Sequence, residues 1–263
     1  MASPDTQRPA EVKDAMRAFY ASEAGDRDSE EWLRQGGSAR VPEPPAAHYF
    51  IDRKVEAAVA LAAAPASSRV LEVGCSFGHM TFLLAERFRD VTAVDLSAES
   101  IALASRRARH YGVSNVRFLE ADAERLERFP TGEFDLVFSF STLRFCPRPA
   151  AALSESFRVV AAGGRVVVDV PNRNCPWYGP IKRAVGIRAH IHDQLFGRGE
   201  IESLMREAGF ENVRSRHILF TTKRMPSVLL PLSRLADRAL EPLPGIRGLS
   251  GIIMAGGRKP ACG

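Results

Sequence analysis

The sequence contains few cysteines and no long apolar run. Its cysteines are spread along the 263 residues without a C-x-x-C pair: Cys75, Cys146, Cys175 and Cys262. This spacing argues against a disulfide framework and a cysteine zinc site. The first 25 residues lack the apolar core of a secretory signal. The longest apolar run, 57–66, has half of the ~20 residues that a membrane span needs and contains Pro65, so a cytoplasmic protein is expected.

The chain also lacks a concentrated basic patch. Its 36 lysines and arginines exceed its 31 aspartates and glutamates, which gives a formal net charge of +5. The densest basic run, Arg106-Arg107-Ala108-Arg109, is typical of a solvated helix face. Because a nucleic-acid binder usually gathers its basic residues in a patch or stripe, no nucleic-acid partner is expected.

What the sequence does contain is an alternation of short apolar runs and helical stretches from residue 69 onwards. The predicted strands are 69–73, 91–95, 116–120, 134–139 and 165–170, and the helices between them are 80–88, 98–111 and 150–161. Strands that alternate with helices in this way predict a doubly wound α/β fold with a mostly parallel sheet. No internal repeat is present, which excludes a solenoid.

The regions before and after this alternation are less regular. Residues 1–66 predict a helical cover, with helices at 11–21 and 47–63, and residues 67–263 predict the α/β domain. The last third predicts a helix at 200–208, a strand at 213–221, an insertion at 221–248 and a final edge strand at 250–255. No second core is required.

A glycine-containing loop follows the first predicted strand, in the sequence VLEVGCSFGHMT of residues 70–81. The nicotinamide fingerprint G-x-G-x-x-G fails here, because Ser76 and His79 occupy two of its glycine positions. The loop also matches the nucleophile elbow G-x-S-x-G of α/β-hydrolases, with Ser76 as nucleophile. Asp169 and then His192 or His217 would supply the remaining triad members. An elbow needs several strands before it, whereas helix and loop precede this one.

The same loop resembles motif I of class I S-adenosylmethionine-dependent methyltransferases, an acidic residue followed by G-x-G-x-G. Glu72, Gly74 and Gly78 match, and Ser76 stands at the central glycine. The resemblance implies that these residues and Cys75 contact the cofactor. It also implies a Rossmann-like sheet of seven strands.

Later strand ends continue the resemblance. Asp95, with Leu96 after it, matches the family's ribose-binding carboxylate at the end of the second strand. Asp122 matches the position that binds the adenine amino group, and Ala123 would offer its backbone N–H to the ring. Ser139 ends the fourth strand at the cofactor edge.

The resemblance covers roughly residues 69–170, including the turn before the fifth strand at 157–168. From the residues alone, Asp95 could instead cap the helix that begins near Ser97, and Asp122 could be a turn aspartate. The resemblance implies an in-line methyl transfer from S-adenosylmethionine, for which positioning supplies much of the catalysis.

The expected acceptor is a small molecule with an oxygen, less often a nitrogen, as the methylated atom: a secondary metabolite, a quinone-like ring or a lipid-linked compound. A non-catalytic cofactor-binding protein is the other alternative. His192 is the candidate general base, since histidine titrates near neutral pH, although a structural histidine is an alternative. His190 and His192 have no further ligand cluster, so no metal is expected. The substrate-side candidates are His48, Tyr49, Arg144, Phe145, Asn172 and Tyr178.

The segment 224–247 carries an apolar helical face next to Arg234 and Arg238. That face is formed by Val228, Leu232, Leu235 and Ala239. Core packing, a lid, a dimer contact and a helix on a membrane surface are all consistent with this pattern. Peripheral membrane contact through 224–247 would suit an apolar acceptor.

Overall fold

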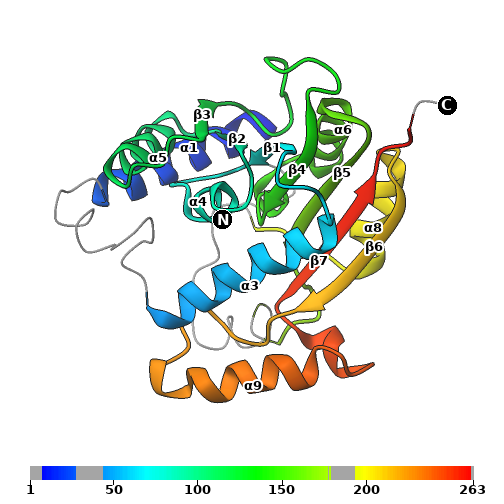
Figure 1. Cartoon of the computed structure of the whole chain (residues 1–263). Coiled ribbons are helices and arrows are strands. Elements are labelled where there is room, and N and C mark those ends of the chain that lie inside the picture. The colour runs from blue at the N-terminus through cyan, green and yellow to red at the C-terminus, as the bar shows by residue number, and fades with distance from the viewer. Residues whose placement is uncertain (1–7, 28–43, 177, 179–192, 262–263) are drawn as a thin grey trace.

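A seven-stranded sheet with helices on both faces forms the body of the protein (Figure 1). The computed structural model describes residues 8–27, 44–176, 178 and 193–261. The strands are β1 Arg69–Val73, β2 Asp90–Asp95, β3 Val116–Glu120, β4 Phe134–Phe140, β5 Val160–Pro171, β6 Glu211–Ile218 and β7 Ile252–Arg258. The α-helices are α1 Pro9–Asp26, α3 Pro45–Ala62, α4 His79–Ala85, α5 Ala98–His110, α6 Pro149–Val159, α8 Arg198–Glu207 and α9 Leu230–Leu240. The predicted α/β class is confirmed.

The strand order is β3-β2-β1-β4-β5-β7-β6. The first five of these strands run parallel, whereas β7 is antiparallel to both β5 and β6. From β1 the sheet grows through β2 to β3 at one edge, whereas from β4 it grows towards the other edge. The boundary between β1 and β4 is thus the point where the order of the strands reverses. In open α/β sheets, ligands bind at the carboxyl ends of the strands beside such a switch point.

The expectation of an edge strand at 250–255 is wrong, because β7 lies between β5 and β6. Its two glycines explain how it fits there. A Cβ on Gly256 would lie 3.0 Å from Leu61 Cδ2 of α3, and one on Gly257 would lie 2.8 Å from Phe210 Cβ, just after α8. The two elements press on opposite faces of the strand, so only a strand without side chains at these positions fits between them.

Each face of the sheet has its own apolar core. On one face, Leu153 of α6 and Ile201 of α8 pack against β4, β5 and β7. On the other face, Phe50, Val55 and Ala58 of α3 pack with α4 against the same strands. The second helix of the predicted N-terminal cover therefore contributes directly to the core of the domain.

Arg107 corrects the expectation of a fully solvated face on α5. Its side chain is completely buried, whereas Arg109 of the same run is exposed. The guanidinium donates a hydrogen bond to the Phe77 carbonyl and lies 4.8 Å from the centroid of the Phe82 ring. Burial lowers the pKa of Arg107 to about 10. A backbone carbonyl at the end of the β1–α4 loop thus holds a charge that the sequence pattern places in solvent.

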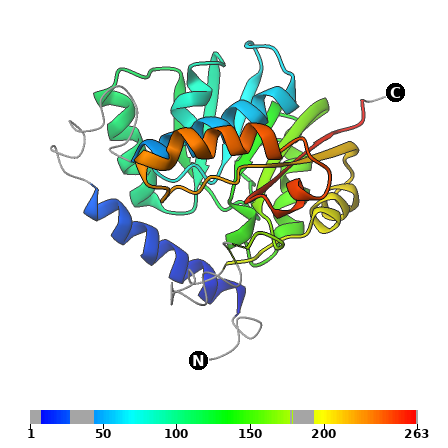
Figure 2. The ribbon, with the colours of Figure 1, turned by 90° about the horizontal axis from the view of Figure 1, so that it is seen from below.

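The insertion after β6 forms the short helix η3 Ser227–Leu229, then α9, then η4 Ile246–Leu249. α9 lies at the outside of the molecule beside α3 (Figures 1 and 2). Its buried Asp237 accepts hydrogen bonds from Phe220 N at 2.6 Å, Thr221 N at 3.1 Å and Thr221 Oγ1 at 2.7 Å. Glu241 accepts one from Leu219 N at 2.9 Å and pairs with Arg53 of α3 at 2.6 Å. Two carboxylates therefore fix the orientation of α9.

Within the described residues, no helix combines the length and the apolar character that crossing a bilayer requires.

Replacement of Asp237 by alanine is expected to destabilise the protein by about 3 kcal/mol, because buried donors of the 220–221 backbone and of Thr221 would lose their acceptor. Denaturant unfolding followed by circular dichroism measures this change. The matched control is Arg238→Ala, one residue further along α9 and exposed, which should shift the free energy of unfolding by less than about 0.5 kcal/mol. Equal effects of the two variants would show that Asp237 does not anchor the helix.

Candidate active site

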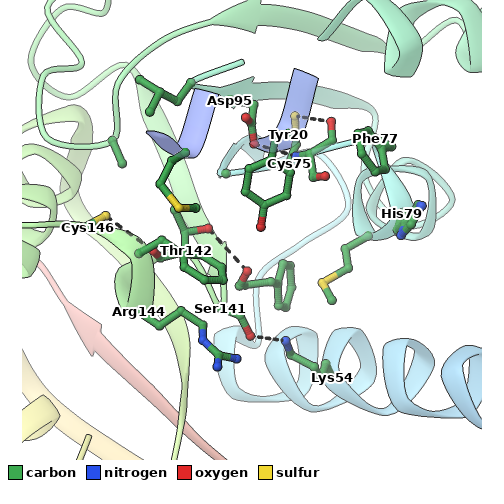
Figure 3. A pocket seen from close by; sticks show the side chains of 18 of the residues that line it. Tyr20, Lys54, Cys75, Phe77, His79, Asp95, Ser141, Thr142, Arg144 and Cys146 are labelled. Atoms are coloured by element: carbon green, nitrogen blue, oxygen red, sulfur yellow. Dashed lines mark hydrogen bonds between the residues drawn. The ribbon is translucent and has the colours of Figure 1, made fainter. Parts of the chain in front are cut away.

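A cavity of about 800 Å³ lies at the carboxyl ends of β1, β2 and β4. Residues of α1 and α3, the loops after β1, β3 and β4, and the segment 220–224 line it. In Figure 3, Asp95 and Lys54 stand on opposite sides of this space, and the ring of Tyr20 points into it. The volume lies within the range of small-molecule and cofactor sites.

The loop after β1 is held against the neighbouring strands. The backbone N–H groups of Gly74 and Cys75 both donate to the Val94 carbonyl, at 2.7 and 2.9 Å. Gly74 has φ +81°, and a Cβ there would lie 2.0 Å from Thr142 Oγ1. Thr142 Oγ1 in turn donates to the Val73 carbonyl at 3.0 Å. Glycine is therefore required at position 74 by the close approach of the loop after β4.

Ser76 and Asp95 connect this loop to β2. Ser76 has φ +47°, a left-handed conformation that favours glycine. This conformation explains why the family motif has glycine at this position. Ser76 N donates to Asp95 Oδ2 at 2.7 Å, and Ser97 N donates to Oδ1 at 3.1 Å. Burial raises the pKa of Asp95, and these backbone hydrogen bonds act in the opposite direction.

Asp95 both faces the cavity and contacts the start of the next helix. Its carboxylate lines the cavity, at the place where the family resemblance puts the ribose carboxylate. It also supports the start of α5, whose N-cap is Ser97, with the Ser97 hydroxyl accepting from Ser100 N at 3.1 Å.

Glu72 is a second carboxylate in the cavity wall. It is buried in β1 and accepts a hydrogen bond from Thr81 Oγ1 at 2.6 Å. Burial raises the pKa of Glu72 to about 7, with a further upward contribution from the charge of Asp95 and a downward one from the Thr81 hydrogen bond. This part of the cavity therefore favours a positively charged group.

The helix α1 closes the cavity over the loop after β3. Lys13 Nζ lies 2.6 Å from Asp122 Oδ2 and 2.7 Å from Glu124 Oε2. Burial acts to lower the pKa of Lys13, but the hydrogen bonds and charges of both carboxylates outweigh it and leave the pKa raised. Burial and the charge of Asp95 both raise the pKa of Tyr20, further along α1. Asp122 thus holds α1 in place, besides its predicted role towards the adenine.

A buried ion pair forms the opposite side of the cavity. Lys54 Nζ of α3 lies 2.9 Å from Asp169 Oδ2 of β5, and both side chains are almost fully buried. Ser141 Oγ accepts from Lys54 Nζ at 2.8 Å and donates to Asp169 Oδ2 at 3.0 Å. The ammonium also lies 5.7 and 5.8 Å from the centroids of the Phe50 and Phe140 rings. Burial lowers the pKa of Lys54, against the attraction of Asp169.

Arg144 contributes another cation to the cavity wall. Its Nε donates to Asp193 Oδ1 at 2.6 Å, and its guanidinium carbon lies 5.2 Å from the Phe145 ring centroid and 5.6 Å from that of Tyr178. These contacts connect the loop after β4 to Asp193 and Tyr178. Aromatic rings and two fixed cations therefore line the side of the cavity away from Asp95.

The structure brings most of the predicted cofactor residues together. Those that line the cavity are Glu72, Gly74, Cys75, Ser76, Asp95, Leu96, Asp122 and Ala123. Gly78 and Ser139 are not part of the lining. Gly78 starts α4 with φ +79°, and a Cβ on it would lie 3.2 Å from the Phe82 ring. Ser139 is buried within β4.

The predicted substrate-side residues divide in the same way. Arg144, Phe145 and Tyr178 line the cavity, whereas His48, Tyr49 and Asn172 do not. The side-chain amide of Asn172 donates to the Gly248 and Ser250 carbonyls, both at 2.8 Å, so it holds the turn before β7. The ring of Tyr49 lies 4.8 Å from the guanidinium carbon of Arg234, on the side of α9. His190 and His192, including the candidate base, lie outside the described residues.

The carboxylate that the hydrolase alternative requires is already occupied. Asp169, which would orient a triad histidine, is bound to Lys54 and Ser141 instead. The Nδ1 atom of His217 lies 3.5 Å from Ser250 Oγ, near the end of β6. Ser76 follows the first strand of the sheet, in a loop fixed by its own hydrogen bond to Asp95.

Several lining residues were missed by sequence reasoning, including Lys13, Tyr20, Lys54, Ser141 and Lys223. The role of Lys54 could have been inferred from the sequence. It shares the helical face of Phe50, Val55 and Ala58, which is apolar apart from this one lysine. A lysine on the buried face of a helix needs a partner, so its presence there indicates a built site.

Comparison with known proteins points in one direction. A family model described as a methyltransferase domain matches residues 71–168. The ubiquinone biosynthesis O-methyltransferase of Psychrobacter arcticus is 29% identical over 169 residues, covering 60% of this chain and 66% of that protein. An S-adenosyl-L-methionine-dependent Diels–Alderase of Talaromyces variabilis is 27% identical over 229 residues, covering 75% of this chain and 77% of that protein.

The fold itself matches a solved structure over most of its length. Magnesium protoporphyrin IX methyltransferase of Synechocystis, with S-adenosylhomocysteine bound, aligns with a TM-score of 0.64 at 15% identity and covers 94% of this chain and 99% of that chain. The chain matches 66% and 43% of the length of two curated ubiquinone biosynthesis O-methyltransferases.

The raised pKa of Glu72 predicts a pH dependence of stability. Because the pKa of about 7 in the folded state lies above the ordinary glutamate value of 4.5, the contribution of this group is fully present below pH ~4.5 and is lost as pH rises through 7. Between pH 6 and 8 it should lower the free energy of unfolding by about 1.4 kcal/mol.

Urea unfolding at several pH values measures this loss, and Glu72→Gln should remove it. The control Glu86→Gln changes the same group on an exposed side chain just after α4 and should keep the native pH profile. A native-like profile for Glu72→Gln would assign the dependence to another group.

Proposed function

Since the chain belongs to the class I S-adenosylmethionine-dependent methyltransferases, we propose that it transfers the methyl group of this cofactor to an oxygen atom of a small-molecule acceptor. The choice of oxygen is supported by the relatives named ubiquinone biosynthesis O-methyltransferase. The observation that carries the proposal is the cavity itself, with the buried Glu72 and the partly buried Asp95 on one side and a buried lysine among aromatic rings on the other.

The residues on the Asp95 side fit the cofactor. S-Adenosylmethionine carries a sulfonium, an ammonium and two vicinal ribose hydroxyls, and the carboxylates of the buried Glu72 and the partly buried Asp95 suit positive charge and hydroxyl donors. Each Asp95 oxygen accepts one backbone N–H, and a carboxylate has about four acceptor sites, so acceptor capacity for two hydroxyls remains. When bound, the cofactor supplies a methyl group on a good, neutral leaving group.

The residues on the opposite side fit an acceptor with an apolar ring and an acidic hydroxyl. An ammonium has three N–H donors, and Lys54 directs two of them to Ser141 and Asp169. We assign its remaining donor, on a side chain that lines the cavity, to the acceptor oxygen. Phe50 and Phe140 would pack against the acceptor ring beside it.

In this arrangement Lys54 favours the anionic form of the acceptor oxygen, since a cation nearby lowers the pKa of a hydroxyl. When bound, S-adenosylmethionine would supply its methyl group to that oxygen and would leave as neutral S-adenosylhomocysteine. The acceptor hydroxyl would release its proton to solvent water as the anion beside Lys54 forms. Asp169 and Ser141 hold the ammonium in position and so act as positioning residues.

Titration calorimetry with S-adenosylhomocysteine is the first test. The native protein should bind in the micromolar range, and Asp95→Asn should weaken binding by about tenfold or more, because an acceptor of charge-assisted hydrogen bonds is lost. Asp90→Asn is the matched control, since Asp90 starts the same strand at its exposed end. Absence of binding by the native protein would overturn the proposal.

Transfer of labelled methyl to a panel of phenols, catechols and amines then separates methyl transfer from cofactor binding alone. This distinction matters because one relative is named as a Diels–Alderase. Label on phenolic oxygen supports the proposal, whereas label only on amines would replace oxygen by nitrogen. Cofactor binding without any label, on any acceptor, would identify a non-methylating protein.

The role of Lys54 is tested with the double variant Lys54→Met/Asp169→Asn, which avoids leaving a lone charge buried. Its kcat on the best acceptor should fall by about 100-fold, while its affinity for S-adenosylhomocysteine stays native. The pH profile of kcat should also shift to higher pH, because the acceptor hydroxyl loses its stabilising cation. A native kcat would remove Lys54 from the mechanism.

A further inference from the structure

The insertion carries an unusual surface. Among the described residues, the exposed large hydrophobic side chains all come from the stretch 228–249: Val228, Leu229, Leu232, Leu235, Leu243, Ile246 and Leu249. Val228, Leu232 and Leu235 are 83%, 67% and 62% exposed. We call the seven exposed side chains of 228–249 the α9 face. Exposed apolar side chains concentrated in one segment are typical of an interaction surface.

The exposure of the α9 face is not the result of a loosely attached helix. The inner side of α9 is held by the three hydrogen bonds to Asp237, by the pair between Glu241 and Arg53, and by burial of Leu230. The orientation of the helix is therefore set by its polar anchors, and these turn its leucines outward.

The same segment also carries exposed cations. The exposed basic residues of the same segment are Lys223, Arg224, Arg234, Arg238 and Arg247. Between 222 and 250, where the structure describes every residue, the acidic side chains are Asp237 and Glu241, and both face inward in the contacts above. The outward surface of the segment is thus apolar and positively charged.

We infer that the α9 face docks on an anionic phospholipid membrane. Leucine and isoleucine side chains enter the boundary between headgroups and acyl chains, and arginines and lysines contact the lipid phosphates. A second copy of the chain fits less well. A two-fold interface places the same patch against itself, so the cations around one α9 face would meet the identical cations of the other.

The position of the α9 face relates this docking to the cavity. Thr222, Lys223 and Arg224, at the start of the segment, line the cavity, and α9 lies beside α3, which carries Lys54 (Figures 1 and 2). Docking would bring this side of the cavity to the lipid surface. Given the proposed methyl transfer, the acceptor then belongs to the apolar or lipid-linked compounds that dissolve in a bilayer; this consequence rests on the proposed function, whereas docking itself does not.

Vesicle flotation with the full chain tests the docking. Vesicles of phosphatidylcholine with about 30% phosphatidylglycerol should carry the protein to the top of the gradient, whereas vesicles of phosphatidylcholine alone should carry much less. Each basic residue near an anionic surface contributes roughly fivefold to partitioning, so binding should also fall as salt is raised. Failure to bind the anionic vesicles at low salt would overturn the inference.

Two sets of variants separate the apolar and cationic contributions. Val228→Gln/Leu232→Gln/Leu235→Gln should reduce partitioning by at least about tenfold. Arg238→Gln/Arg247→Gln should reduce it on anionic vesicles only, and the control Arg109→Gln/Arg128→Gln has the same change in net charge at exposed sites on other elements. Equal binding by the triple variant and the native chain, or equal losses in the two arginine pairs, would contradict docking through this face.

The remaining outcomes are also informative. The native chain could elute from a size-exclusion column as a dimer and the triple variant as a monomer, with neither binding vesicles. That result would show that a second copy covers the α9 face. Asp95→Asn should float like the native protein, because docking needs no cofactor. Vesicle binding by a protein without methyl transfer would therefore leave the docking intact and reject only the proposed function.

Discussion

The buried ion pair between Lys54 and Asp169 connects the parts of this protein. It joins α3, from the N-terminal third, to β5, which lies next to the central strand β4, at the point where the cavity meets the core. Desolvation of two charges is costly, and such a pair is tolerated when further contacts compensate for the lost water. Here Ser141 Oγ and the rings of Phe50 and Phe140 provide those contacts. The same residues form the wall of the cavity, so the contacts that stabilise the charge also shape the site.

The Asp95 side of the cavity could be predicted from sequence because its residues follow strands. Carboxyl ends of parallel strands meet at one edge of a sheet, so Glu72, Asp95 and Asp122 converge as soon as the strands are recognised. The structure supplies physical reasons for two of the motif positions. Gly74 accommodates the Thr142 side chain, and Ser76 adopts the left-handed backbone that the motif usually assigns to glycine.

The rest of the cavity wall could not be predicted in this way, because it is assembled from helices and loops far apart in the chain. Lys13 and Tyr20 reach the cavity from α1, more than a hundred residues from Asp122, and no local pattern records that distance. Lys54 was readable in principle, as a lysine on an apolar face. Asn172 shows the converse error. A polar residue just after a strand looked like a site residue, whereas its amide satisfies two carbonyls of the turn before β7.

One consequence of the α3 geometry concerns motion. Arg53 and Lys54 are consecutive residues, so their side chains leave the helix about 100° apart. One holds α9 through Glu241, and the other holds the cavity wall through Asp169. Any rotation of α3 about its axis must therefore displace both attachments together. A displacement of α9 is therefore expected to move the wall of the cavity, and a displacement of that wall is expected to move α9.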